Sequence, residues 1–298
     1  MIQSILVVSP PQHDFIHHQT FFDIALSFAH SLRDLGQPCE VFVNPADAFG
    51  KTLVFGAHMI PAFGGTIEGG DYVIFNLEQH DSEAMNEGYL DILRRYEVWD
   101  YSRNNIEFLL GKGVNAKLCE IGYHPCMSNI RLGKSATITG GATTPSKVQY
   151  VSAGVGNQAG VFDILFYGSI NERRAKVIDA LKATGKNVVN LVGYGAYRDK
   201  YISRAKIVLN MHYWDAAIFE IVRVSHLLAN EKCVVSEYGK EPELEAPYWN
   251  GVAFSSYDKL VDTCLALLED DELRTKMAKA GFDALRARKQ AEFLKGLL

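Results

Sequence analysis

The polar residues best suited to chemistry follow a short apolar run in a strand–helix–strand pattern over residues 206–236. They are Asn210, His212, Glu220, Arg223 and His226. Ligands of open α/β sheets bind outside the carboxyl ends of the strands, so we expect a ligand site here. A histidine at this point can hydrogen-bond a sugar or a phosphate, although a lone histidine is more often structural. Glu220 and Arg223 share a face of the predicted helix, where they hold sugar or ribose hydroxyls or simply form an intrahelical ion pair.

A second polar group lies in segment 166–174, whose pattern is typical of a strand, a glycine turn and a helix start. Its members are Gly168, Ser169, Arg173 and Arg174. Glycine lets the backbone approach a ligand closely, and the free N–H groups of a helix start attract anions. Arginine adds a forked donor that suits phosphate. The segment therefore predicts a pyrophosphate clamp, or alternatively an ordinary strand–helix turn with two solvated arginines.

Candidates for a catalytic base follow two predicted strands of the N-terminal half. His13 and His18 lie in a histidine-rich loop after the first strand, and Glu78 lies just beyond a strand at 71–76. A histidine with a near-neutral pKa can deprotonate a hydroxyl group. A solvated loop without a catalytic role is the competing interpretation.

Motifs for several other kinds of chemistry are missing from the sequence. It has no C-x-x-C, no H-E-x-x-H and no D-x-D pair after a strand, so no metal is predicted. Gly193-Tyr-Gly195 is followed by Arg198 where a dinucleotide fingerprint has its third glycine, which disfavours a nicotinamide cofactor. Neither a G-x-S-x-G elbow nor a G-x-x-x-x-G-K-[ST] phosphate loop is present. We therefore predict no cofactor.

Composition narrows the class of protein. Of the 298 residues, 48% are hydrophobic and 22% are charged, which is typical of soluble globular proteins. The net charge of −5 gives no support for a nucleic-acid partner, and no stretch approaches the roughly 20 apolar residues of a membrane span. The N-terminus is typical of a first strand and not of a signal peptide. Five scattered cysteines favour free thiols in a reducing cytosol, so we expect a cytoplasmic protein.

Strand and helix patterns alternate along the chain, which predicts parallel sheets covered by helices on both faces. Thr52–Phe55 is predicted as a further strand or an edge element, and a short helix is predicted over 198–204. Residues 133–160 are rich in Gly, Ser and Thr and indicate an interdomain linker or a mobile loop. We predict an α/β protein with two Rossmann-like domains, residues 1–132 and 161–298, facing each other across a cleft.

The last part of the chain resembles the C-terminal module of GT-B glycosyltransferases, in the branch near family-1-like and CgeB-like proteins. The similarity rests on three stretches in this order: DILFYGSINERR (163–174), the segment 204–237 and the tail 244–285. The N-terminal half is similar in general outline, through VIFNLEQ (73–79) and VWDYSRNNIEFL (98–109).

The resemblance implies that the C-terminal domain holds a nucleotide-sugar donor and that the N-terminal domain meets the acceptor. The implied activity is metal-independent transfer of a hexose from a nucleoside diphosphate to a glycan or another hydroxyl acceptor. Many relatives carry R-x-x-E on the helix that here reads Arg223-Val-Ser-His226. This departure leaves open a catalytically inactive GT-B protein that binds nucleotide sugars or serves as a scaffold. A sugar-nucleotide epimerase on the same fold is a further alternative.

Overall fold

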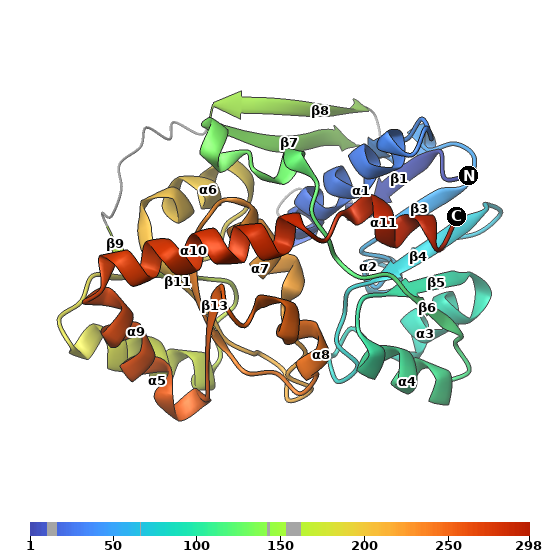
Figure 1. Ribbon diagram of the computed structural model, residues 1–298. Helices are drawn as coiled ribbons and strands as arrows, with labels where there is room; N and C mark the ends of the chain where they lie inside the picture. Colours follow the sequence, from blue (N-terminus) through green and yellow to red (C-terminus); the bar gives the residue numbers. More distant parts are fainter. Residues whose placement is uncertain (11–16, 66, 142–143, 153–161) are drawn as a thin grey trace. The chain divides into compact units, whose positions relative to one another are not determined.

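The computed structural model describes residues 1–10, 17–65, 67–141, 144–152 and 162–298, which form two units (Figure 1). Unit 1 consists of Met1–Cys126, Ala136–Gln149 and Lys289–Leu298, and unit 2 consists of Met127–Ser135 and Tyr150–Arg288. The last ten residues thus group with the N-terminal half, whereas the sequence places them in the C-terminal domain.

Unit 1 is built on a six-stranded parallel sheet with the order β2-β1-β3-β4-β5-β6. The strands are β1 (Ser4–Val7), β2 (Glu40–Phe42), β3 (Thr52–Phe55), β4 (Tyr72–Asn76), β5 (Glu97–Asp100) and β6 (Ala116–Leu118). Most of their residues are buried, because parallel strands covered on both faces are continuous apolar runs. The strand predicted at Thr52–Phe55 is confirmed, but it lies between β1 and β4 and not at an edge.

Two of the five described helices of unit 1 begin at side-chain caps. The five helices are α1 (Phe22–Asp34), α2 (Met59–Ala62), α3 (Glu87–Arg95), α4 (Arg103–Gly111) and α11 (Gln290–Lys295), with short 3₁₀ turns at His17–Phe21, Pro45–Asp47 and Pro125–Met127. The side chains of Asn86 and Ser102 accept backbone N–H groups at the starts of α3 and α4. The Gln290 side chain accepts the Gly122 N–H at 2.7 Å, which ties α11 to unit 1.

The segment predicted as a linker or mobile loop contains a two-stranded sheet of β7 (Lys134–Gly141) and β8 (Thr144–Ser152). The Ser146 hydroxyl accepts the backbone N–H groups of Val43 and Asn44 at 2.9 and 3.1 Å. The Ser146 N–H in turn donates to the Asp47 carboxylate at 2.8 Å. These bonds fix the middle of β8 to the chain that follows β2, within unit 1.

Unit 2 is built on a five-stranded parallel sheet with the order β10-β9-β11-β12-β13. The strands are β9 (Phe162–Tyr167), β10 (Val188–Leu191), β11 (Ala205–Asn210), β12 (Cys233–Glu237) and β13 (Val252–Ser255). The helices are α5 (Glu172–Ala183), α6 (Gly195–Arg204), α7 (Ile221–Ala229), α8 (Pro242–Glu245), α9 (Leu260–Leu268) and α10 (Asp271–Arg286), with 3₁₀ turns at Ile130–Leu132, Ala246–Tyr248 and Tyr257–Lys259. Both units are therefore Rossmann-like, and the predicted α/β class is confirmed; the predicted cleft stays a prediction.

Two helices of unit 2 begin elsewhere than predicted. α6 starts at Gly195, three residues before the predicted start, and α7 starts only at Ile221. Ala217 has φ +48°, a left-handed conformation that a non-glycine residue rarely adopts. The chain therefore turns before α7, and Glu220 is the residue that precedes this helix. In the described part of the chain, no helix is long and apolar enough to cross a membrane.

Candidate functional site

Three neighbouring strands of unit 2 bring the predicted polar residues together at their carboxyl ends. Gly168 and Ser169 follow β9, Asn210 ends β11, and Glu237 ends β12. Because β9, β11 and β12 are adjacent and parallel, these ends lie along one edge of the sheet. Helix α5, which starts after Gly168-Ser169, adds Arg173 and Arg174 to this edge. The sequence did not single out Glu237.

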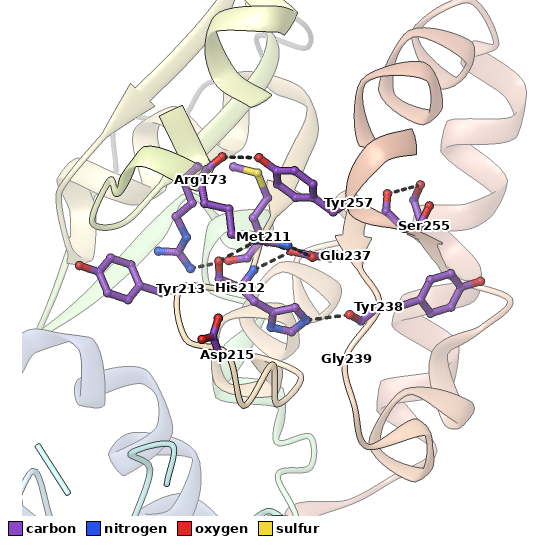
Figure 2. Close-up of polar contacts among 12 residues, drawn as sticks. Arg173, Met211, His212, Tyr213, Asp215, Glu237, Tyr238, Gly239, Ser255 and Tyr257 are labelled. Carbon is purple, nitrogen blue, oxygen red and sulfur yellow. Dashed lines mark hydrogen bonds and ion pairs between the residues drawn. The ribbon is translucent and has the colours of Figure 1, made fainter. Parts of the chain in front are cut away.

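Arg173 is held by Glu237 (Figure 2). Its Nη1 donates to Glu237 Oε2 at 2.7 Å and to the His212 carbonyl at 3.3 Å, and its Nη2 pairs with Glu237 Oε1. The guanidinium lies over the Tyr257 ring, 4.0 Å from the ring centroid, and the Tyr257 hydroxyl donates to the Arg173 carbonyl. The hydrogen bond with Glu237 raises the pKa of Arg173. The side chain remains 35% exposed, so a ligand can reach it.

Arg174 is buried, with only 2% of the residue exposed. Its Nη1 donates to the Ser169 carbonyl at 2.9 Å, and its Nη2 donates to the Met211 carbonyl and to Glu220 Oε1, the latter at 2.8 Å. Burial lowers the pKa of Arg174, and the Glu220 carboxylate opposes that effect. Arg174 therefore joins the chain after β9 to the chain after β11, and it is an internal support of the site more than a ligand contact.

Glu220 is shared by two arginines. Arg223 Nη2 lies 2.9 Å from Glu220 Oε2, while Arg174 takes Oε1. Burial alone would raise the pKa of the Glu220 carboxyl, but Arg223 and Arg174 outweigh it and the pKa lies below its ordinary value. Arg223 Nη1 also donates to Asn210 Oδ1 at 3.5 Å. The predicted Glu220–Arg223 pair is present, and it belongs to a network that extends beyond one helix.

His212 is a neutral imidazole inside this network. Its Nε2 lies 3.1 Å from the Tyr238 carbonyl, so Nε2 carries the proton, and its backbone N–H donates to Glu237 Oε2 (Figure 2). Burial lowers the pKa of His212, which leaves it uncharged at neutral pH. Nδ1 is then a buried acceptor without a hydrogen-bond partner in the described residues. Because this atom has no accessible surface, a ligand hydroxyl reaches it only if neighbouring groups move aside.

His226 is not part of this cluster. It is buried, its Nε2 lies 3.2 Å from Asp199 Oδ1 and 3.0 Å from Arg198 Nη2, and Asp199 also accepts the Ser135 hydroxyl at 2.7 Å. Burial raises the pKa of Asp199, but Arg198 and His226 outweigh it and hold this pKa well below its usual range. The sequence offered no signal for this network, since Ser135, Asp199 and His226 are far apart along the chain.

Two of the candidate bases, His18 and Glu78, lie among the described residues of unit 1. His13 lies outside the described residues. His18 Nε2 lies 3.5 Å from the Ser9 hydroxyl, and its ring packs edge-on against Phe22. Glu78 Oε1 lies 3.4 Å from Nδ1 of His58, a residue that the sequence analysis did not single out. The order of the strands would have predicted this contact, because His58 follows β3, Glu78 follows β4, and these two strands are neighbours in the sheet.

Within the part of the chain that the structure describes, no group of three or more His, Cys, Asp or Glu side chains could hold a metal ion. The predictions of no metal and no cofactor stay predictions. The three guanidinium groups of Arg173, Arg174 and Arg223 face the two carboxylates of Glu220 and Glu237, which leaves one positive charge among these five residues. The nearby Asp215 carboxylate, which also raises the pKa of Arg173, offsets that charge. We call these five residues and His212 the arginine cluster.

A family model described as "Glycosyl transferase-like" matches residues 172–294, which include most of unit 2. Among curated proteins, the chain is 35% identical to uncharacterized protein L138 of Acanthamoeba polyphaga mimivirus over 112 residues, 36% of this chain and 13% of that protein. It is 30% identical to uncharacterized protein L140 of the same virus over 113 residues, 37% of each. The chain thus spans well under half the length of these two relatives.

Solved structures resemble this chain over nearly its whole length. The structure of HepE from Anabaena in complex with UDP and glucose has a TM-score of 0.61, 9% identity and coverage of 100% of this chain and 98% of that one. Sucrose-phosphate synthase from Thermosynechococcus elongatus has a TM-score of 0.57, 11% identity and coverage of 99% and 98%. AviGT4, a glycosyltransferase involved in avilamycin A biosynthesis, has a TM-score of 0.57, 13% identity and coverage of 99% and 96%.

At these identities the likeness concerns the fold alone, and that fold is the GT-B arrangement of two Rossmann-like domains. The resemblance predicted from the sequence is thus confirmed for the fold. The family match shows in addition that most of unit 2 has a glycosyltransferase-like sequence. The CgeB-like assignment stays a prediction.

Proposed function

We propose that this protein is a glycosyltransferase that moves a sugar from a nucleoside diphosphate to a hydroxyl acceptor. The observation that carries the proposal is the arginine cluster at the carboxyl ends of β9, β11 and β12, inside the segment that matches the family model. A cluster of three guanidinium groups at a sheet edge suits a diphosphate, because arginine offers forked donors to phosphate oxygens. The UDP and glucose bound by HepE favour a uridine donor.

The cluster supports departure of the diphosphate by electrostatic stabilisation. Charge develops on the leaving oxygen as the bond to the anomeric carbon breaks. Arg173 is partly exposed, Arg223 lies beside Gly168, and both guanidinium groups retain N–H donors for phosphate oxygens. These fixed positive charges can serve where other sites use a metal ion, which makes the proposed transfer metal-independent.

The neutral groups of the same edge suit hydroxyl recognition. His212 holds a buried Nδ1 acceptor, and the buried Asn210 side chain lies between Arg223 and the Ser236 hydroxyl, so both reach a hydroxyl only when the residues that cover them move. We assign these two residues to sugar or ribose hydroxyls, together with Glu220. Ser169 and Gly168 form the turn over which the diphosphate would lie. His226 is left out of the donor site, because its ring is engaged by Arg198 and Asp199.

Donor turnover tests the proposal. The protein is incubated with UDP-glucose and its GDP, ADP and dTDP counterparts, with p-nitrophenyl glycosides as acceptors, and both released nucleoside diphosphate and product mass are measured. Parallel reactions contain EDTA or Mg²⁺. We expect one donor to be consumed and a product to gain one hexose, at equal rates in both buffers. Failure of every donor to bind would refute the proposal.

A nucleotide-sugar binder without turnover is the second candidate. It is favoured by His226, which stands at the last position of the R-x-x-E pattern and contacts Asp199 instead of the cluster. Such a protein would bind a donor and leave it intact through long incubation, whereas a transferase with no acceptor slowly hydrolyses its donor.

A further inference from the structure

A pocket lies at the last strand of the unit 2 sheet, outside the arginine cluster. In the described part of the chain, β13 ends the order β10-β9-β11-β12-β13 and pairs only with β12. The pocket has a volume of about 420 Å³, within the range of about 300–1,000 Å³ that is typical of small-molecule sites. It is lined by Tyr238, Trp249, Val252, Ala253, Phe254 and Met277. All six residues belong to unit 2.

Two glycines fix the walls of this pocket. A Cβ at Gly251 would lie 2.2 Å from Gly281 Cα, so helix α10 contacts the turn before β13 backbone to backbone. Met277 lies one turn before Gly281 on the same face of α10, which brings its side chain to the pocket. Trp249 follows Tyr248, which is buried and whose carbonyl accepts the Gly251 N–H at 2.8 Å. The pocket is therefore already formed without a ligand.

Two aromatic side chains of the pocket face solvent. Tyr238 is 53% exposed and Trp249 is 56% exposed. The Tyr238 ring stacks on Phe254, with centroids 5.6 Å apart and an angle of 20° between the planes. Figure 2 shows that the Tyr238 ring points away from His212. Exposed aromatic surface that gathers in a hollow indicates a ligand, because apolar surface is costly to leave in water.

Uncharged polar groups border the pocket. The Tyr238 N–H donates to the Ser255 carbonyl at 2.9 Å, so the backbone of Ser255 faces β12. Because this direction alternates along a strand, the N–H and C=O groups of Phe254 face the free edge of the sheet. Among the residues that the structure describes, none bonds these two groups, the Tyr238 hydroxyl or the Trp249 Nε1–H. The pocket thus offers both donors and acceptors to a ligand.

These features fit a neutral sugar ring. The C–H faces of a sugar pack on the negative faces of aromatic rings, and its hydroxyls both donate and accept hydrogen bonds. None of the six lining side chains is charged, so nothing in the lining attracts a phosphate or a carboxylate. A peptide that adds to a sheet edge bonds several residues in a row, whereas β13 has four residues, of which Val252 and Phe254 face outward.

We propose that this pocket binds a sugar ring of a neutral glycan, with Trp249 and Tyr238 as its aromatic contacts. The inference goes beyond the proposed function, because binding here involves no transfer and uses no residue of the arginine cluster. The pocket and that cluster are nevertheless neighbours within unit 2. Tyr238 follows Glu237, and its carbonyl lies 3.1 Å from His212 Nε2. A glycan bound here is therefore kept beside the proposed donor site.

The test measures glycan binding by the wild type, Trp249→Ala, Trp249→Phe and Tyr197→Ala. Tyr197 is a matched control, because it lies in unit 2 and is also 56% exposed but does not line the pocket. The labelled proteins are applied to an array of neutral glucans, mannans, galactans and N-acetylglucosamine oligomers. Each glycan that binds is then titrated by calorimetry, with and without UDP.

The wild type should bind at least one neutral glycan, equally well with and without UDP. Trp249→Ala should bind it about tenfold more weakly or worse, as expected for truncation of an aromatic anchor. Trp249→Phe keeps an aromatic face and should lose less, and Tyr197→Ala should match the wild type. Since Trp249 is exposed, its variants should melt within about 2 °C of the wild type, which shows that they are folded.

Three results would overturn the inference: a wild type that binds no glycan of the array, equal binding by Trp249→Ala, or competition between the glycan and UDP. An array of apolar peptides is the counter-probe. Binding there that depends on Trp249, without any glycan binding, would assign the pocket to a peptide instead. The proposed function is tested separately: a wild type that binds a glycan through Trp249 but binds no nucleotide would refute the transferase and leave this inference standing.

Discussion

Gly168 and Arg223 lie so close that a Cβ at Gly168 would be 2.9 Å from Arg223 Nη2. Gly168 also has φ +131°, a backbone conformation that other residues rarely adopt. The turn after β9 thus depends on glycine for two reasons, and it places the backbone directly beside a guanidinium. This contact joins the two polar groups predicted separately from the sequence.

Gly168→Ala should displace Arg223 and weaken nucleotide binding by about tenfold or more, with a loss of about 1–3 kcal/mol in the free energy of unfolding. Gly185→Ala is the matched control, because Gly185 also has positive φ (+80°) but no atom within 4 Å of the added carbon. Denaturant unfolding and calorimetry with UDP measure both effects. Equal UDP affinities in the two variants would show that the Arg223 contact is irrelevant to binding.

Arg174→Ala should destabilise the protein by about 3–5 kcal/mol, because it leaves the Glu220 carboxylate with one cation fewer in a buried setting. The same change removes the bonds to the Ser169 and Met211 carbonyls. Lys176→Ala, on the solvent side of the same helix, should leave stability unchanged. Denaturant titration measures the difference, and a stable Arg174→Ala protein would contradict the supporting role assigned to this residue.

His226→Glu, which restores the R-x-x-E pattern, should destabilise the protein and should not improve its activity. The new carboxylate would lie beside Asp199, whose Oδ1 is 3.2 Å from His226 Nε2, and two buried like charges repel. The expected loss is on the order of 3 kcal/mol, of the size found for an uncompensated buried charge. His226→Gln, which brings no charge, should lose less. Higher transfer activity in His226→Glu would place this residue in the donor site after all.

Glu245 should make stability depend on pH near neutrality. Only 2% of the residue is exposed, and burial raises the pKa of its carboxyl from 4.5 to about 7, against the opposing effect of the Gly239 N–H that it accepts. Since the folded-state pKa is raised, the stabilising contribution of the protonated acid is complete below about pH 4.5 and is lost as the pH rises through about 7. Glu245→Gln should therefore raise the free energy of unfolding more at pH 8.5 than at pH 5, by up to about 3 kcal/mol. The melting temperature should rise accordingly at pH 8.5.

The control for this pH effect is Glu243→Gln, which changes an exposed glutamate of the same short helix. It should leave the pH dependence of the melting temperature unchanged. Identical melting curves for Glu245→Gln and the wild type at pH 8.5 would show that the carboxyl titrates normally.

The sequence predicts the strands of the two parallel sheets well because buried parallel strands are continuous apolar runs, and α5 starts within the segment 166–174 as predicted. It misses β7 and β8, whose Gly-, Ser- and Thr-rich segment has a weak apolar pattern. It fails at the start of α7, because Glu220 was predicted to lie in the helix and instead precedes it, after a turn in which Ala217 has a positive φ. The Glu220–Arg223 pair could be predicted, because its two residues are close together in the sequence. Pairs such as Arg173–Glu237 and His58–Glu78 could not, because they depend on which strands are adjacent in the folded sheet.

The most direct test of the account is calorimetric binding of UDP, GDP, ADP, CMP and dTDP to the wild type, Arg173→Ala and Lys176→Ala. Arg173 is the accessible guanidinium of the arginine cluster, whereas Lys176 on the same helix pairs only with exposed Glu172 in the described structure. The account predicts that one diphosphate binds the wild type and Lys176→Ala equally and binds Arg173→Ala at least tenfold more weakly. Equal binding to all three proteins, or no binding to any, would contradict a diphosphate site at the carboxyl ends of β9, β11 and β12.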